Sequence, residues 1–423
     1  MSVVTSLLKP TVRSRPTTGR STPNVVRRET HAPDYVVLVA VVALTAIGVL
    51  VVYSSSAMAS YADSANSFAV VGPQVVWGAL GLVALMVMMR VDYRRLRLFS
   101  IPLYLLAVVL LVLVFVPQFN RVVGGSARFL QIGPLPAIHP AEVAKLALVV
   151  YLAHWLTRRG TDVHSFWRGL LPFLAIYVPL VLLVVIEPDL VTASVLALTG
   201  LLMVFIAGAN LIHLTALAGL GVSGVTVFML HGYQLERVKS WLNLWQDTSG
   251  VGYHAVQGLL ALGLGGLFGA GLGQSQVAGG IALPNASNDF IFAVIGEEFG
   301  LVGATIVIAL FVILAYQGIR ISLAAPDTFG ALLAAGITGW LCVQAFINIA
   351  VVVALIPITG ITLPFISAGG SSLSISLAAV GILLSISRET VERGTFNDAS
   401  ADRGRRNGRA HLPRTGRRPV ASR

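Results

Sequence analysis

Charged side chains are scarce in this sequence of 423 residues: Asp, Glu, Lys and Arg together make up 11% of it, against about 25% in an average soluble domain. Hydrophobic residues make up 56%, and the mean hydropathy is +0.83. A soluble fold of this length has too little interior to hide that much apolar surface. The composition therefore excludes an ordinary soluble enzyme and predicts a chain that is solvated mainly by lipid.

Cysteine is almost absent as well. The single cysteine, Cys342, lies in an apolar run. One cysteine can form neither an intramolecular disulfide nor a Cys-x-x-Cys metal site. A disulfide framework and a cysteine-based metal centre are therefore excluded.

Long uncharged runs dominate the chain instead. Nine stretches of at least 18 residues lack Asp, Glu, Lys and Arg, and each can cross about 30 Å of hydrocarbon as a helix. A tenth contains Glu142, Lys145 and His154, which a span accepts only where they face the protein interior or an interface. Barrel strands would alternate over about ten residues, and these runs do not. We predict an all-α polytopic membrane protein with about ten transmembrane helices, at 35–53, 69–89, 98–116, 141–156, 169–186, 190–208, 211–230, 299–319, 329–356 and 364–387.

Basic residues are distributed unevenly between the two sides of this predicted bundle. Of the 29 Lys and Arg, 24 fall in the terminal segments and the even-numbered connections. The odd-numbered connections hold only Arg121, Arg128, Arg237 and Lys239. Cytoplasmic loops carry the basic excess in membrane proteins, so we expect both termini in the cytoplasm. The first apolar run begins at Tyr35 and is long enough to span, so no cleavable signal peptide is predicted.

The net charge of +11 comes mainly from the two ends of the chain. Segments 1–34 and 388–423 are rich in Arg, Ser, Thr, Pro and Gly and poor in large apolar residues, which is typical of disordered arms. Membrane topology and attraction to anionic headgroups account for their arginines. We therefore expect two disordered basic cytoplasmic tails around a membrane domain at 35–387, and no nucleic-acid partner.

Two outward loops, 117–140 and 231–288, are longer than ordinary connections, and such loops are where function concentrates. The second contains nine glycines within 258–280, including three at four-residue spacing. This spacing is typical of close packing in membranes. A phosphate-binding glycine loop is the weaker alternative, because no strand precedes it. We predict a re-entrant or interfacial helix within this large extracytoplasmic loop between helices 7 and 8.

Ionisable residues at membrane depth are costly unless they are paired or reach water. Glu142 and Lys145 are three residues apart on one helix face, so they form either an internal ion pair or, with Arg128, an anion clamp. Glu187 and Asp189 flank a proline in the turn between two predicted helices. That pair binds a cation, faces Lys145 across the bundle, or is solvated.

A basic and aromatic group lies in the large loop, consisting of Arg237, Lys239, Trp241, Trp245 and Asp247. Aromatic and basic side chains gather at membrane interfaces, and arginine binds phosphate oxygens through charge-assisted hydrogen bonds. The group therefore either contacts a lipid pyrophosphate or serves as an interfacial anchor.

Asp289 is the candidate general base. It lies at the outer mouth of a predicted helix, where partial desolvation raises the pKa of a carboxyl toward the range useful for proton transfer. The alternative is a helix N-cap, since Asp and Asn are preferred caps. Glu297 and Glu298 lie deeper, and burial of two adjacent acids requires partners such as Lys145 or Arg128.

Residues 357–372, with the sequence PITGITLPFISAGGSS, form a loop that leads into the last helix. This segment resembles the signature P-x-x-G-x-x-L-P-F-x-S-x-G-G-S of the SEDS family, which includes FtsW, RodA and SpoVE. The resemblance covers nearly the whole membrane region and leaves out only the tails. Other matching segments are GSARF at 125–129, PAEVAK at 140–145, PDL at 188–190, DFIFA at 289–293 and GEE at 296–298.

The resemblance implies a peptidoglycan glycosyltransferase that polymerises lipid II into a nascent glycan strand at the outer face of the bacterial cytoplasmic membrane, in cell division or elongation. It implies a class B penicillin-binding transpeptidase and other division or elongation membrane proteins as partners. The catalytic aspartate of the family's TDFIFA-like motif corresponds to Asp289. We expect Asp289 to accept the proton of the acceptor 4-hydroxyl while undecaprenyl pyrophosphate leaves with inversion.

Charge on the leaving pyrophosphate must be neutralised. We expect Arg128, Lys145 and Arg237 to do this, with or without a divalent cation, Mg²⁺ or Mn²⁺. Further substrate contacts are expected from Glu142, Glu297, Ser367, Gly369, Gly370 and Ser371. The chain departs from the family pattern at several positions, with His139 where Gln is usual and Asn288 where Thr usually precedes the aspartate.

Two other functions fit a polar cavity in a ten-helix bundle: a lipid II flippase, and a non-catalytic scaffold for a transpeptidase. A flippase needs polar residues through both leaflets, whereas these clusters fall in the outward half. A scaffold does not require an ionised aspartate. The sequence therefore favours the polymerase.

Overall fold

The computed structural model describes residues 31–64, 66–123, 126–131, 133, 137–229, 232–246, 250, 252–277, 283 and 286–389. Most of the predicted basic tails lies outside the described residues. The described chain is mainly helical, which the long apolar runs dictate, since a helix satisfies every backbone polar group within its own segment. Its α-helices are α1 (Tyr35–Ser64), α2 (Val71–Arg90), α3 (Leu96–Leu113), α4 (Pro140–Arg159), α5 (Leu171–Ile186), α6 (Leu190–Ile206), α7 (Leu211–Met229), α8 (Gly232–Leu242), α9 (Tyr253–Gly265), α10 (Ile291–Ala324), α11 (Thr328–Val352) and α12 (Gly370–Ser387).

Each of the ten predicted spans overlaps one of these helices. Seven helices in the described part of the chain are long and apolar enough to cross a membrane, in or around α1, α2, α3, α5, α10, α11 and α12. Helices α6 and α7 are apolar but shorter, and α4 carries the buried pair Glu142 and Lys145. The protein is therefore a helical multi-pass membrane protein, and ten crossings stay a prediction.

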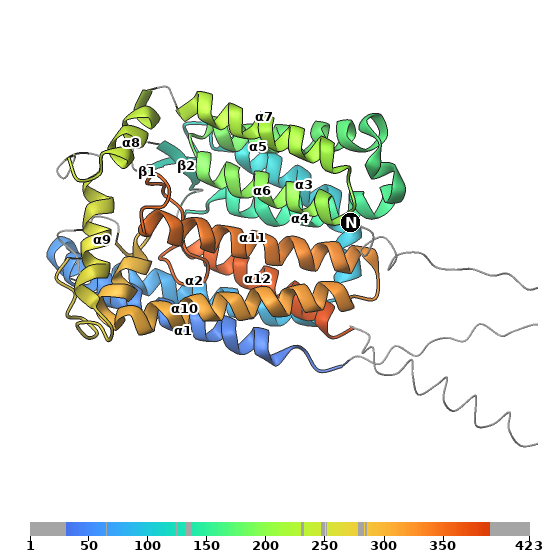
Figure 1. Cartoon of the computed structure of the whole chain (residues 1–423). Helices are drawn as coiled ribbons and strands as arrows, with labels where there is room; N and C mark the ends of the chain where they lie inside the picture. Colours follow the sequence, from blue (N-terminus) through green and yellow to red (C-terminus); the bar gives the residue numbers. More distant parts are fainter. Residues whose placement is uncertain are drawn as a thin grey trace, which may run out of the picture. The chain divides into compact units, whose positions relative to one another are not determined.

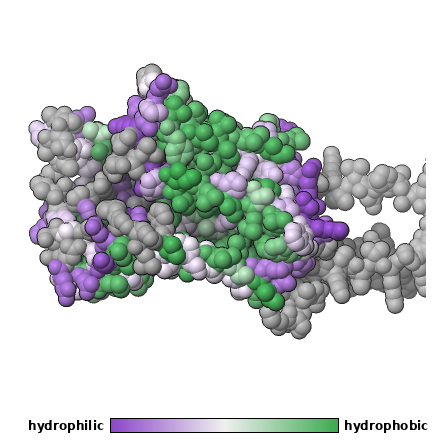
Figure 2. Space-filling model, turned by 90° about the horizontal axis from the view of Figure 1, so that it is seen from above, coloured by the Kyte–Doolittle hydropathy of each residue, from purple (hydrophilic) through white to green (hydrophobic). Residues whose placement is uncertain are grey.

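The long helices lie side by side in Figure 1, with α8, α9 and a small hairpin gathered at one end of them. Contacts pair α2 with α12, α3 with α4, and both α1 and α11 with α10. Figure 2 shows apolar residues across the middle of one face and more hydrophilic residues toward its ends. Large apolar side chains such as Leu98, Ile212 and Leu323 are at least 74% exposed. Such a surface needs lipid around it.

The hairpin lies in the first long outward loop, where helical patterning gives no signal. Strand β1 (Asn120–Val123) pairs antiparallel with β2 (Ser126–Leu130), with Asn120 opposite Leu130 and Arg121 opposite Phe129. The register shifts between Arg121 and Val122. The hairpin fixes the strand that carries Arg128.

The large loop contains two helices, α8 and α9, and the segment after α9 enters a break in α10. Gly300 in α10 has φ 66° and ψ −163°, so the helical hydrogen bonds stop there. Leu301 and Val302 donate instead to the carbonyls of Gly266 and Leu267, at 2.9 and 3.1 Å. A Cβ at Gly300 would lie 2.4 Å from the nitrogen of Gly269, so only glycine allows this approach.

Candidate functional site

A cavity of about 640 Å³ lies at the end of the bundle that carries the hairpin and α8. Its volume is in the range of small-molecule sites. Its walls come from β2, the N-terminal ends of α4, α6 and α12, helix α8, and the segments before α10 and after α11. Seven predicted site residues line it: Arg128, Glu142, Arg237, Asp289, Gly369, Gly370 and Ser371. Three predicted site residues do not line it: Lys145, Glu297 and Ser367.

Asp289 lies in the turn that precedes α10. The N-cap of that helix is Phe290, and no side chain makes a capping hydrogen bond there. The N-cap alternative for Asp289 is therefore wrong. The main-chain carbonyl of Asp289 accepts a hydrogen bond from Nδ2 of Asn348 at 3.0 Å. Asp289 also lines the cavity.

The electrostatic surroundings of Asp289 suit a general base. The pKa of this carboxyl is raised to about 6, mainly by burial, with Arg128 and Arg237 lowering it and Asp189 raising it. A carboxyl with that pKa is mostly ionised at neutral pH and is still more basic than an ordinary aspartate. Asp289 can thus accept a proton from a hydroxyl in the cavity.

Two guanidinium groups reach the cavity from different elements. Arg128, on β2, donates from Nη2 to the carbonyl of Pro188 at 2.5 Å, and its Nε is buried with no hydrogen-bond partner in the described structure. Arg237, on α8, lies with Nη1 3.4 Å from the carbonyl of Ile358. Planar guanidinium groups bind phosphate oxygens through paired hydrogen bonds. The two arginines are therefore placed to hold a phosphate group in the cavity.

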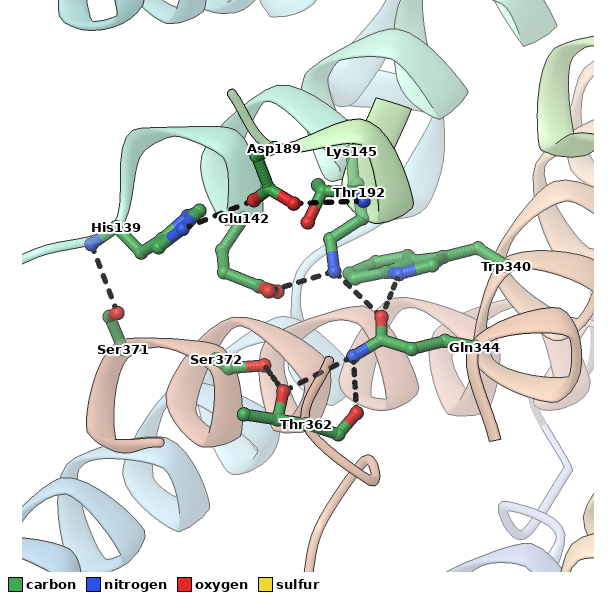
Figure 3. A network of polar contacts seen from close by, with 10 residues as sticks. All are labelled: His139, Glu142, Lys145, Asp189, Thr192, Trp340, Gln344, Thr362, Ser371 and Ser372. Carbon is green, nitrogen blue, oxygen red and sulfur yellow. Dashed lines mark hydrogen bonds and ion pairs between the residues drawn. The ribbon is translucent and has the colours of Figure 1, made fainter. Parts of the chain in front are cut away.

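Lys145 lies behind the cavity wall in the polar network of Figure 3. Its Nζ is 2.8 Å from Oε1 of Glu142 and 2.6 Å from Oε1 of Gln344, and only 1% of the residue is exposed. The internal ion pair with Glu142 is confirmed. Lys145 thus contacts the cavity through Glu142 and not directly.

Gln344 links this ion pair to the last outward loop. Its Nε2 donates to the carbonyl of Thr362 at 2.9 Å, and Trp340 donates to its Oε1 at 2.9 Å. We did not select Gln344 or Thr362 from the sequence, although a glutamine in the middle of an apolar span is itself a signal of a buried polar contact.

Asp189 caps α6, because its Oδ1 accepts from the backbone nitrogen of Thr192 at 3.1 Å. Its Oδ2 is 3.5 Å from Nε2 of His139. The neighbouring Glu187 is buried with both carboxyl oxygens unpartnered in the described structure, and burial raises its pKa to about 8. Among the described residues, no three His, Cys, Asp or Glu side chains form a group that could hold a metal ion. Mg²⁺ is usually bound by only one or two carboxylates together with substrate phosphates, so the expected divalent cation stays a prediction.

Glu297 and Glu298 have different partners from those expected. The carboxylate of Glu297 accepts from the backbone nitrogens of Gln276 and Val277, at 2.7 and 2.9 Å. The carboxylate of Glu298 accepts from Ser54 Oγ at 2.5 Å. The expectation that Lys145 or Arg128 compensates these acids is wrong, because backbone N–H groups and hydroxyls of nearby segments do so. Glu297 thus fixes the segment after α9.

The signature loop, residues 357–372, contacts the turn that carries Asp289. Ser367 is buried, and its Oγ donates to the carbonyl of Asn288 at 2.6 Å while it accepts from the nitrogen of Leu363 at 2.7 Å. At Gly370 an added Cβ would lie 2.1 Å from the ring of Trp77. The glycine therefore allows Trp77, a lining residue that we did not predict, to reach the cavity.

The basic and aromatic group of the large loop is divided. Trp241 donates from Nε1 to the carbonyl of Ala354 at 2.8 Å, which joins α8 to the segment after α11. Trp245 is 67% exposed. Asp247 lies outside the described residues. The half-buried Trp241 holds the helix that brings Arg237 to the cavity.

Comparison with known proteins places this geometry in a family. Residues 35–392 match the model of the FtsW/RodA/SpoVE family, described as cell cycle proteins. The chain belongs to this family. It is 41% identical over 358 residues to stage V sporulation protein E of Bacillus subtilis. The aligned region covers 84% of this chain and 97% of the relative.

Other members of the FtsW/RodA/SpoVE family match a similar share of this chain. The probable peptidoglycan glycosyltransferase FtsW of Mycobacterium tuberculosis is 39% identical over 357 residues, covering 84% of this chain and 68% of the relative. The fold is similar to RodA of Thermus thermophilus, with a TM-score of 0.62, 30% identity and coverage of 85% and 98%. It is also similar to a chain of a peptidoglycan synthase complex that coordinates polymerization and crosslinking, with a TM-score of 0.68, 30% identity and coverage of 84% and 98%. The chain is thus a cell-wall synthesis protein of this family.

Proposed function

We propose that this protein is a peptidoglycan glycosyltransferase that polymerises lipid II into glycan strands at the outer face of the cytoplasmic membrane. The observation that carries the proposal is the cavity in which the Asp289 carboxylate, with a pKa near 6, lies with the guanidinium groups of Arg128 and Arg237. The family relatives named peptidoglycan glycosyltransferase support the reaction class.

The mechanism follows from these groups. Asp289 accepts the proton of the acceptor sugar hydroxyl as its oxygen attacks the anomeric carbon of the donor. The bond between that carbon and the pyrophosphate oxygen breaks, and the configuration inverts. Because pyrophosphate leaves readily once its charge is balanced, one carboxyl suffices, whereas an inverting glycosidase needs a second carboxyl as acid. Arg128 and Arg237 balance the charge.

Other groups around the cavity position these three. Asn348 and Ser367 hold the Asp289 turn to the signature loop, and Glu142 with Lys145 fixes the opposite wall. A divalent cation, if it acts, would arrive with the pyrophosphate.

The orientation predicted from the basic residues is consistent with this proposal. The cavity and the Arg94, Asp327 and Glu389 network occupy opposite ends of the helices, because the former adjoins the start of α4 and α12 and the latter adjoins the start of α11 and the end of α12. The basic excess favours the second end as cytoplasmic. The cavity would then face outward, and both termini would lie in the cytoplasm.

We further propose that the chain acts with a class B penicillin-binding transpeptidase. The similar chain solved in a peptidoglycan synthase complex supports this, since that complex couples polymerization to crosslinking.

The test is polymerisation of purified lipid II by the detergent-solubilised full chain, alone and with transpeptidase partners. We expect glycan strands from the wild type and a loss of about 10² to 10⁴ in rate for Asp289→Asn and Asp289→Ala. Asp162→Asn is the matched control, because Asp162 is exposed beyond the C-terminal end of α4, away from the cavity.

Three outcomes would contradict the proposal. Full activity in both Asp289 variants would assign the base to another residue. If the protein, placed in vesicles, moved lipid II from one leaflet to the other without forming strands, a flippase would be favoured. An absence of strands with an authentic partner, combined with stimulation of that partner's crosslinking, would favour a scaffold.

A further inference from the structure

His139 is the one histidine among the described residues that line the cavity. It precedes α4, and three different elements hold it. Its backbone nitrogen donates to Oγ of Ser371 at 3.2 Å, its Nε2 is 3.5 Å from Oδ2 of Asp189, and its ring packs edge-on against Phe129 with centroids 5.1 Å apart. The imidazole is therefore fixed in orientation.

The contacts of Asp189 define which ring nitrogen carries the proton. Oδ1 of Asp189 already accepts from the nitrogen of Thr192, so Oδ2 is the oxygen that faces Nε2 of His139. A carboxylate can only accept, so Nε2 of a neutral His139 carries the hydrogen. Nδ1 then presents a lone pair, and it is buried with no hydrogen-bond partner in the described structure. Buried polar atoms in proteins nearly always have a hydrogen-bond partner, so we expect a bound ligand to supply one for Nδ1.

Four charged groups surround the ring. Asp189 and Glu142 favour its protonation, while Lys145 and Arg128 oppose it. The other contacts, Ser371 and Phe129, are uncharged. Burial is the largest influence and lowers the pKa of His139 below its usual range, so the ring is neutral near pH 7 in the empty cavity. An anion bound beside Arg128 would offset that guanidinium and favour the charged imidazole.

We propose that His139 is a further ligand-binding residue of the cavity, which takes one proton from solvent onto Nδ1 when a pyrophosphate group enters and donates it to a phosphate oxygen. The imidazolium then lies between Asp189 and the ligand, and the cavity gains a third cationic contact. The choice of pyrophosphate rests on the function proposed above. The position of the proton on Nε2 and the unpartnered Nδ1 rest on the geometry of His139 and Asp189.

Proton uptake distinguishes this role from a purely structural one. A glutamine at position 139 can still donate a hydrogen bond to Asp189, but it cannot take up a proton. His139→Gln is therefore the conservative variant. His164→Gln is the matched control, since His164 ends the short helix Gly160–His164 beyond the far end of α4 and is exposed.

The experiment is calorimetric titration of the detergent-solubilised full chain with undecaprenyl pyrophosphate, in buffers of different ionisation enthalpy. We expect the wild type and His164→Gln to take up about one proton more than His139→Gln on binding near neutral pH. We also expect wild-type affinity to fall as the pH rises through about 6 to 8, and the affinity of His139→Gln to change less. A parallel titration with inorganic pyrophosphate shows whether the headgroup alone suffices.

Equal proton uptake by the wild type and a folded His139→Gln, with both binding the lipid, would overturn this inference and leave the proposed function intact. Failure of the wild type to bind undecaprenyl pyrophosphate would overturn both. Thermal unfolding of each variant verifies that it is folded. If His139→Gln does not fold, His139→Asn provides the same comparison.

Discussion

Asn348 joins the Asp289 turn to the signature loop: its Nδ2 donates to the main-chain carbonyl of Asp289 at 3.0 Å and to that of Ile361 at 2.6 Å. Asn348 is 1% exposed, so its amide group is held inside the protein between the two carbonyls. The position of the proposed base therefore depends on a side chain that lies in α11, far from it in sequence.

We expect Asn348→Ala to lower the polymerisation rate by about 10- to 100-fold, since misplacing a reacting group by a small distance costs about that much. Two carbonyls lose a donor, that of Ile361 in a buried hydrogen bond, so the free energy of unfolding should also fall by about 1–3 kcal/mol. Initial rates at saturating lipid II, together with thermal unfolding, measure both. An unchanged rate constant with only a lower melting temperature would show that the contact is structural.

The pH dependence of the rate should follow Asp289. Because its pKa is raised to about 6 and the base must be ionised, activity should rise as the pH increases through about 6 and level off above it. The measurement is the rate constant at saturating substrate from pH 5 to about 8. A midpoint near the ordinary value for aspartate would contradict the desolvated site.

The same shift predicts a stability effect of opposite sign. A carboxyl with a raised pKa in the folded state stabilises the fold below its unfolded pKa and loses that contribution as the pH rises through about 6. Asp289→Asn removes the buried charge, so it should raise the melting temperature at pH 8 by an amount corresponding to at most about 3 kcal/mol, and should have little effect at pH 4. Thermal unfolding in detergent at the two pH values checks this. Destabilisation at pH 8 would show that the carboxylate makes a favourable contact.

Gly360 faces the carboxylate of Asp289, and an added Cβ would lie 3.2 Å from its Oδ2. Gly360→Ala should therefore narrow the cavity beside the base and lower activity without unfolding the protein. The control is Gly224→Ala on α7, where a Cβ meets nothing within 4 Å. Polymerisation rates and melting temperatures of the two variants give the comparison, and equal activities would contradict the expectation.

The buried pair Glu142 and Lys145 should show strong coupling. Lys145→Met leaves Glu142 buried without its cation and should cost about 3–5 kcal/mol of stability. The double variant with Glu142→Gln should recover part of that loss, because no uncompensated charge remains. Unfolding of the two single variants and the double variant forms the cycle. Additive losses would mean that Lys145 is held mainly by Gln344.

The membrane helices were predictable because each apolar run is long enough to determine its own structure. The hairpin was not predicted from helical periodicity, although the Gly124-Gly125 pair between Val122-Val123 and Phe129-Leu130 is a hairpin signal. The break at Gly300 has no local signature, since one glycine in an apolar helix is ordinary in membranes.

The candidate site was predictable in part. Asp289, Arg128 and Arg237 stand out because charge is expensive near lipid, and all three line the cavity. Glu297 stands out for the same reason, yet its charge is compensated by backbone nitrogens, which no sequence pattern records. The burial of Lys145 behind Glu142 likewise depends on Gln344, about 200 residues away along the chain.

The break at Gly300 divides α10 into two helices, and the rotation of one about its axis does not set the rotation of the other. In a continuous helix each inserted or deleted residue turns everything beyond it by about 100°. Here Leu301 and Val302 are bonded to the segment after α9, so a length change beyond them rotates the lipid-facing side chains and leaves the turn of Asp289 where it is. The orientation of the piece before the break is therefore set by its contacts with the segment after α9 and not by the length of the piece beyond it.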